Sequence, residues 1–208
     1  MITRLTAGLL APPLCWSCRA PAARGSPLCR GCRRALRFLP RAPVKLCGLA
    51  VWAPVAYEGP AGELVKGLKF HGATAVAAQM AALIVAGAPE AMLGGTLVPV
   101  PLHPGRRRAR GFNQAEAIAA AIGARTGRPL ADCLARSGPD RRQVGRGRAA
   151  RLAGPAGSVC ATASAPAEAV LVDDVVTTGG TLSACAAALR AAGARQVRAV
   201  AFTRTAGR

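Results

Sequence analysis

Acidic residues are scarce in this sequence. Its 208 residues include 9 Asp and Glu against 28 Lys and Arg, a formal net charge of +19, and the first acid in the chain is Glu58. A field of this sign attracts phosphates, nucleotides, nucleic acids or anionic membranes without choosing among them. Aromatic residues are also rare, at 3%, which argues against a platform for stacking unpaired bases.

Long apolar runs are missing as well, and no segment is long and apolar enough to span a bilayer. The first fifteen residues, MITRLTAGLLAPPLC, imitate a signal peptide only faintly, because Pro12 and Pro13 stand where small residues would precede a cleavage site. We therefore expect a cytoplasmic protein. In that reducing compartment, paired cysteines more often hold a metal than form disulfides. Nothing in the sequence sets the oligomeric state.

Two CxxC pairs, CWSC at residues 15–18 and CRGC at 29–32, stand near the N-terminus. Two such turns can complete a tetrahedral site, and a closed four-thiolate site is structural rather than catalytic. The alternatives are a redox pair or four unrelated cysteines. The pattern predicts structural Zn²⁺ bound by Cys15, Cys18, Cys29 and Cys32. The scattered cysteines are expected to be small core residues; they are Cys47, Cys133, Cys160 and Cys185.

We expect two parts: a zinc-ribbon-like segment with a linker over residues 1–50, and a main domain over 51–208. Residues 36–50 are predicted to be a connection, and 102–112 a basic loop. The Arg-, Gly- and Pro-rich stretch 136–157 is expected to be a long flexible loop, either functional or disordered. Extended segments are predicted over 51–57, 96–101, 169–172 and 196–202, and helices over 61–87, 113–124 and 181–192, the second with Asn113 as its N-cap. The final strand–helix–strand run implies a parallel sheet.

Residues 169–182, AVLVDDVVTTGGTL, concentrate the chemistry. Asp173 and Asp174 follow an apolar strand, at the carboxyl edge where parallel sheets bind ligands. The threonines and glycines that follow lead into a helix N-terminus, which is an anion site. A ribose 5-phosphate satisfies both, whereas an acid pair that merely caps a turn is the structural alternative. Neither a Walker lysine nor GxGxxG is present. The expected ligand loop consists of Val175, Val176, Thr177, Thr178, Gly179, Gly180 and Thr181.

This stretch resembles the 5-phosphoribosyl pyrophosphate (PRPP) signature of type I phosphoribosyltransferases. Together with the CxxC pairs, the motifs at residues 67–72 (GLKFHG), 98–119 (VPVPLHPGRRRARGFNQAEAIA) and 141–145 (RRQVG) resemble the ComF family. The resemblance implies an α/β type I phosphoribosyltransferase fold, a mostly parallel sheet flanked by helices, with a small cysteine-rich N-terminal segment. This chain departs from the family pattern at Gly154, where asparagine is usual, and at Arg146, where leucine is frequent.

The resemblance also implies a chemistry: transfer of a 5-phosphoribosyl group from PRPP, with Mg²⁺ on the leaving pyrophosphate. Asp173 and Asp174 would hold the ribose and the magnesium shell. Candidates around the pyrophosphate are Lys69, His103 and Arg110. Lys69 could instead snorkel from a helix face, and His103 could be a loop hydrogen-bond donor. The loop over 136–151, with Arg141, Arg142 and Arg148, could close over the site.

Three functions stay open at this point. The first is a phosphoribosyltransferase with an unknown nitrogen nucleophile. The second is a regulator that senses PRPP or a nucleotide without catalysis. The third is an accessory factor for competence and DNA uptake, whose zinc ribbon and basic loops contact DNA or a helicase-like partner. The acid pair and phosphate loop favour the first two, while the basic cysteine-rich end favours the third.

Overall fold

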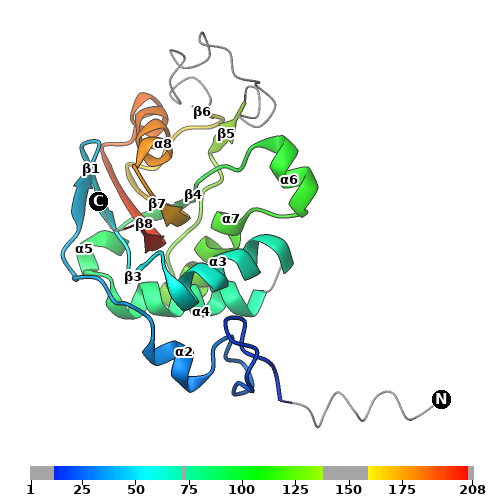
Figure 1. The fold of residues 1–208 in the computed structure, drawn as a ribbon. Coiled ribbons are helices and arrows are strands. Elements are labelled where there is room, and N and C mark those ends of the chain that lie inside the picture. Colours follow the sequence, from blue (N-terminus) through cyan, green and yellow to red (C-terminus); the bar gives the residue numbers. More distant parts are fainter. Residues whose placement is uncertain (1–11, 72–73, 138–158, 206–208) are drawn as a thin grey trace, which may run out of the picture.

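The computed structural model describes residues 12–71, 74–137 and 159–205. Its centre is a six-stranded sheet with the order β1-β2-β8-β7-β4, in which β3 also pairs with β8 (Figure 1). All pairings within this sheet are parallel except that of β1 with β2. The strands are β1 (Val44–Leu46), β2 (Leu49–Trp52), β3 (Val55–Ala56), β4 (Thr96–Pro99), β7 (Glu168–Val176) and β8 (Gln196–Arg204).

Helices cover both faces of the sheet (Figure 1). On one face lie α3 (Gly59–His71), α4 (Thr74–Gly87) and α7 (Gln114–Thr126); on the other lies α8 (Gly180–Ala191), with the small antiparallel ribbon of β5 (Leu134–Arg136) and β6 (Val159–Ala161) beside it. Short helices complete the described chain: α2 (Arg30–Arg34), α5 (Glu90–Leu93) and α6 (Pro104–Arg110). Among the described residues, no helix is long and apolar enough to cross a membrane.

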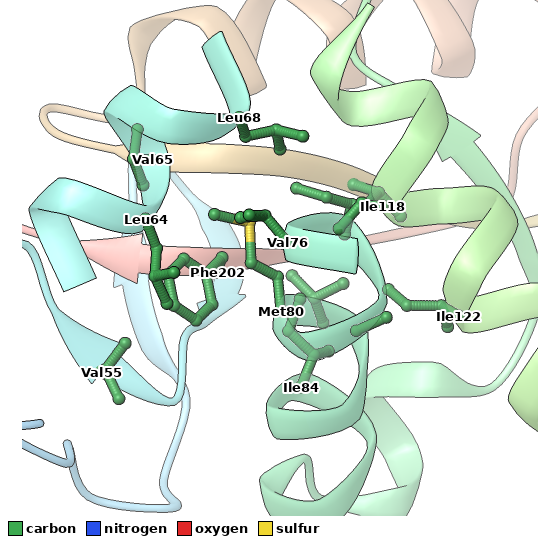
Figure 2. Close-up of a cluster of buried hydrophobic side chains, with 14 of the residues drawn as sticks. Val55, Leu64, Val65, Leu68, Val76, Met80, Ile84, Ile118, Ile122 and Phe202 are labelled. Carbon is green, nitrogen blue, oxygen red and sulfur yellow. The ribbon is translucent and has the colours of Figure 1, made fainter. Parts of the chain in front are cut away.

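The apolar run of β7 reflects burial on both faces, as expected for a strand inside a parallel sheet. Val170 and Val172 pack in the cluster formed with α3, α4 and α7, whereas Leu171 packs in the cluster formed with α8. Figure 2 shows the first cluster, where Leu64 and Leu68 of α3 gather with side chains of α4 and α7 around Phe202 of β8. The core therefore fixes α3 against the sheet.

The expected strand–helix–strand run is confirmed as β7–α8–β8, with β7 and β8 parallel. The N-cap is also confirmed, since the Asn113 side chain accepts a hydrogen bond from the N–H of Ala115. The predicted helix over 61–87 is two helices, α3 and α4. The strand predicted over 51–57 is split into β2 and β3 around Pro54, because proline cannot donate to the ladder.

Two predicted irregular segments are wrong. Within the predicted connection 36–50, β1 and β2 form a hairpin whose two-residue turn, Cys47 and Gly48, has positive φ at both positions. A Cys-Gly turn lacks the usual Asn or Asp signal. Within the predicted loop 102–112 lies α6, whose N-cap is His103 and whose C-cap is Gly111 at φ 78°. Histidine is outside the preferred N-cap residues.

The scattered cysteines divide in their burial. Cys133 and Cys185 are buried as expected, but Cys47 and Cys160 are exposed, so the expectation of core residues is wrong for these two. Cys47 is exposed because it forms the turn of the β1–β2 hairpin. That hairpin also crosses residue 50, where the sequence suggests a domain boundary; the two-part division stays a prediction.

Candidate functional site

Asp173 and Asp174 lie at the carboxyl edge of the sheet. The pairing of β4 with β7 ends at Pro99 and Val172, whereas β8 stays paired with β7 as far as Val176. The two acids thus lie within β7, in the two positions after the last residue that pairs with β4, and not beyond the end of β7. A ligand at this edge meets them where one neighbouring strand has stopped.

Two hydrogen bonds hold the acid pair in place. The N–H of Asp174 donates to Oδ1 of Asp173 at 2.8 Å, and the hydroxyl of Thr203 donates to the carbonyl oxygen of Asp174 at 3.2 Å. Burial raises the pKa of Asp173 well above its usual range, and the adjacent charge of Asp174 raises it further. Cations and hydroxyl donors at this pair therefore stabilise its ionised form.

Lys69 supplies a cation to this pair. Its Nζ lies 2.7 Å from Oδ2 of Asp174, and the lysine and aspartate side chains are 25% and 11% exposed. The same Oδ2 is buried and accepts no well-aligned hydrogen bond from the described residues, so charge rather than hydrogen-bond geometry holds the contact. The structure thus brings Lys69, a predicted pyrophosphate residue, to the acid pair.

The loop after β7 leads into the N-terminus of α8. Thr177 and Thr178 are exposed, and Gly179 is the N-cap of α8 in the left-handed conformation, at φ 81°. The first N–H groups of the helix, on Gly180 and Thr181, have no carbonyl one turn earlier to bind. A helix N-terminus with free backbone donors favours an anion.

Gly179 is required for a reason that the sequence did not reveal. A Cβ at this position would lie 2.9 Å from the Cβ of Leu46 in β1, and the positive φ already disfavours a side chain. The turn of the β1–β2 hairpin also rests on the loop, with Cys47 Sγ 3.6 Å from the carbonyl oxygen of Thr178. A bulky residue at 179 would displace the hairpin, so it does not test the phosphate site cleanly.

His103 and Arg110 bracket α6, which follows β4 at the same edge of the sheet. His103 Nδ1 accepts a hydrogen bond from the N–H of Gly105 at 3.2 Å. Arg110 donates to Oε1 of Gln114 at 2.9 Å. Gln114 was missed by sequence reasoning: it is buried, and its Nε2 has no hydrogen-bond partner among the described residues. The surrounding RGFNQ gave no sign that this side chain turns inward.

The basic loop proposed to cover the site lies almost wholly outside the described residues. This applies to Arg141, Arg142 and Arg148, and to the departures from the family pattern at Arg146 and Gly154. The described strands β5 and β6 lie on either side of that segment, and β6 packs beside α8.

The four N-terminal cysteines come together. The sulfur atoms of Cys15, Cys18, Cys29 and Cys32 all lie within 4.8 Å of one another, and those of Cys18 and Cys29 are 3.6 Å apart. A tetrahedron with Zn–S bonds of roughly 2.3 Å has edges of roughly 3.8 Å. The donor set and its spacing therefore fit a zinc ion.

Proton affinities differ within this cluster. Burial raises the pKa of Cys15, but the backbone N–H groups of Cys18, Cys29 and Ser17 outweigh it and lower that pKa to about 6. Burial raises the pKa of Cys32 to about 12. One sulfur is thus ready to bind as a thiolate, while metal binding would have to displace the proton of another.

The sequence is similar to known proteins. Residues 164–208, which include β7, the loop and α8, match the phosphoribosyl transferase domain family. DNA utilization protein YhgH of Salmonella typhimurium (strain LT2) is 31% identical over 234 residues, covering 95% of this chain and 99% of that protein.

Solved structures give a weaker likeness. A glutamine PRPP amidotransferase from B. subtilis, complexed with ADP and GMP, matches 68% of this chain with 19% identity and a TM-score of 0.38. An allosteric regulatory enzyme of purine biosynthesis matches 78% with 19% identity and a TM-score of 0.37. The chain spans 26% and 28% of the length of these enzymes, and a similarity of this degree says nothing about activity.

The matched domain and the sheet order identify the type I phosphoribosyltransferase fold, a mostly parallel sheet flanked by helices, here with a cluster of four cysteines at the N-terminal end. With 31% identity across nearly the whole of YhgH, the chain belongs to the ComF family.

Proposed function

We propose that this protein binds PRPP with Mg²⁺ and transfers its 5-phosphoribosyl group to a nitrogen nucleophile. One observation carries the proposal: Asp173 and the buried Asp174 lie at the carboxyl edge of a parallel sheet, and a short loop leads from them to the N-terminus of α8. The carboxylates suit the ribose hydroxyls, and the helix N-terminus suits the 5-phosphate of the same sugar.

In this proposal, Asp173 and Asp174 accept hydrogen bonds from the ribose hydroxyls. Backbone N–H groups of Gly180 and Thr181 and the hydroxyls of Thr177 and Thr178 hold the 5-phosphate. The magnesium ion, when bound with PRPP, would neutralise charge on the leaving pyrophosphate. Carboxylate oxygens are suitable ligands for it. No protein nucleophile is needed, because positioning and electrostatic stabilisation supply the catalysis.

Lys69 has two roles in this scheme. In the ligand-free protein it balances the charge of Asp174. When the ligand arrives, Lys69 turns to the pyrophosphate, where Arg110 and His103 supply further donors. The ribose hydroxyls then donate to Asp174 in place of Lys69. The buried carboxylate therefore has a partner both with and without the ligand, which avoids the cost of an isolated buried charge.

Equilibrium binding tests whether the protein binds PRPP, and pyrophosphate release tests whether it transfers the 5-phosphoribosyl group. Titration calorimetry with Mg²⁺–PRPP should give saturable binding, with weaker binding of ribose 5-phosphate. Release of pyrophosphate when candidate nitrogen bases are added would establish transfer. Binding without release from any base would favour the sensing function over catalysis.

A contact with DNA is the second candidate function, and the N-terminal surface favours it. Between residue 12 and Glu58 the described chain has no acid, and its exposed basic residues are Arg19, Arg24, Arg30, Arg33, Arg34, Arg37, Arg41 and Lys45. The relative in Salmonella carries the name DNA utilization protein. We propose that this segment, in a cytoplasmic protein, contacts nucleic acid phosphates or a DNA-uptake partner, with zinc holding its four cysteines.

A further inference from the structure

The cysteine cluster contacts the phosphoribosyl domain through one aromatic ring. Trp16, which stands between Cys15 and Cys18, packs on Gly67 of α3: a Cβ at position 67 would lie 2.8 Å from Cε3 of the indole. Glycine is unfavourable inside a helix, and Gly67 is an interior residue of α3. The helix thus carries its glycine where the ring needs the space.

The ring is held by the fold of the cysteine segment. The N–H of Trp16 donates to the carbonyl oxygen of Pro27 at 2.9 Å, which ties the first CxxC turn to the chain entering the second. Cys15, Leu28 and Leu36 belong to the same buried cluster as Leu64 of α3. Figure 1 shows this segment, with α2, beneath α3 and α4. The position of the ring therefore depends on how the two CxxC turns are joined.

The opposite side of α3 faces the acid pair. Lys69 follows Gly67 by two residues, a rotation of roughly 200° around a helix. Trp16 thus bears on one side of α3, and Lys69 reaches from the other side to Asp174, 2.7 Å from its Oδ2. The neighbouring Leu64 and Leu68 are fixed in the core beside Phe202 (Figure 2). Gly67 and Lys69 are both in the C-terminal half of α3, so a local displacement of the backbone at Gly67 moves Lys69 relative to Asp174 even though the helix as a whole is held by the core.

We propose that Trp16 is a positioning residue for the phosphoribosyl site: metal bound by the four cysteines fixes its ring on Gly67, and α3 then keeps Lys69 where it pairs with Asp174 in the ligand-free protein and reaches the pyrophosphate when PRPP binds. Metal loading of the cysteine segment thereby sets the affinity for Mg²⁺–PRPP. The inference rests on the proposed function for its ligand, but the placement of Lys69 can be measured without any ligand.

Two glycine variants on the same helix provide the test. Gly67→Ala introduces a Cβ against the indole, whereas Gly62→Ala places one where no heavy atom lies within 4 Å. Gly67→Ala should weaken Mg²⁺–PRPP binding roughly five- to tenfold, and Gly62→Ala should leave it unchanged. In ligand-free protein, the ¹³C chemical shift of the Asp174 carboxyl carbon should move in Gly67→Ala only.

Metal removal from Trp16 variants separates coupling from folding. Chelation of zinc should weaken Mg²⁺–PRPP binding by wild type and by Trp16→Phe, which keeps a ring. It should have no further effect on Trp16→Leu, because the link to α3 is already cut. Trp16→Leu should still bind zinc, since all four cysteines remain, and metal content reports this independently of binding.

The two proposals fail in different ways. If zinc-loaded wild type does not bind Mg²⁺–PRPP, the proposed function is lost, and the Asp174 carboxyl shift alone decides whether Trp16 positions Lys69. If wild type binds and Gly67→Ala matches Gly62→Ala in both affinity and carboxyl shift, the positioning role is wrong. An equal effect of chelation on wild type and Trp16→Leu would also overturn it.

Discussion

Replacement of Lys69 by methionine tests the ion pair on which the site is built. Lys69→Met keeps the length of the apolar stem and removes the charge. It leaves the carboxylate of Asp174, a residue only 8% exposed, without its nearby cation. The acid next to it, Asp173, already has a raised pKa. The variant therefore leaves two adjacent carboxyl groups to share a poorly hydrated edge.

The expected loss lies between two limits. Breaking a fully buried ion pair costs roughly 3–5 kcal/mol, and an exposed pair contributes roughly 0.2–1 kcal/mol. With 25% and 11% of the two side chains exposed, we expect about 2 kcal/mol. In a chain of this size, that lowers the melting temperature by roughly 4–8 °C. The double variant Lys69→Met/Asp174→Asn should recover most of this loss, because no unpaired charge remains.

Urea unfolding at fixed free zinc measures these differences, and the same helix supplies the control. Lys66 pairs with Glu63 at 2.8 Å, but those side chains are 59% and 42% exposed. Lys66→Met should therefore cost less than about 0.5 kcal/mol. If Lys69→Met is no more destabilising than Lys66→Met, or if Lys69→Met and Asp174→Asn add independently in the double variant, the ion pair does not hold the site.

Three further outcomes follow from the same structure. The pKa of Asp173 is raised in the folded protein, so folding favours its protonated carboxyl. Wild type should therefore lose stability as pH rises through that pKa, and Asp173→Asn should not lose this part. Urea unfolding over a pH series measures the difference, and parallel plots of unfolding free energy against pH for the two proteins would contradict it. Metal analysis should find about one zinc per chain and much less in Cys15→Ser; a metal-free wild type that is equally folded would exclude the zinc site. DNA affinity should fall steeply with salt and ignore sequence, whereas salt-independent or sequence-selective binding would contradict contact through phosphates.

The main elements of the site could be predicted because their signals are local. The run AVLVDD marks a strand buried on both faces, and the glycines after it mark a helix start. Both appear in β7 and α8. The CxxC pairs likewise act over short distances, and their sulfur atoms converge. In each case a few consecutive residues determine the geometry.

The contacts between these elements could not be predicted, since they join residues far apart in the sequence. Nothing near Lys69 indicates that it reaches Asp174, and nothing near Gly67 indicates the ring of Trp16. Gly179 looks like a residue needed only for close approach of a phosphate, yet Leu46 of the hairpin also occupies the space where its Cβ would lie. The short helix α6 was missed because His103 is an unusual cap.

The central claim, that the acid pair and the loop after it bind PRPP, is tested most directly by calorimetric titration of Mg²⁺–PRPP into wild type and Asp174→Asn. Loss of a charged hydrogen bond costs roughly 1.5–3 kcal/mol, so Asp174→Asn should bind roughly ten- to a hundredfold more weakly. Glu90→Gln is the control, because this exposed acid lies in α5. Gly95, two residues after α5, lies against Glu168, the first residue of β7, so Glu90 is near the end of that strand opposite to the acid pair. It should bind as wild type does. No affinity of wild type at millimolar PRPP, or equal affinity of Asp174→Asn and wild type, would contradict the assignment.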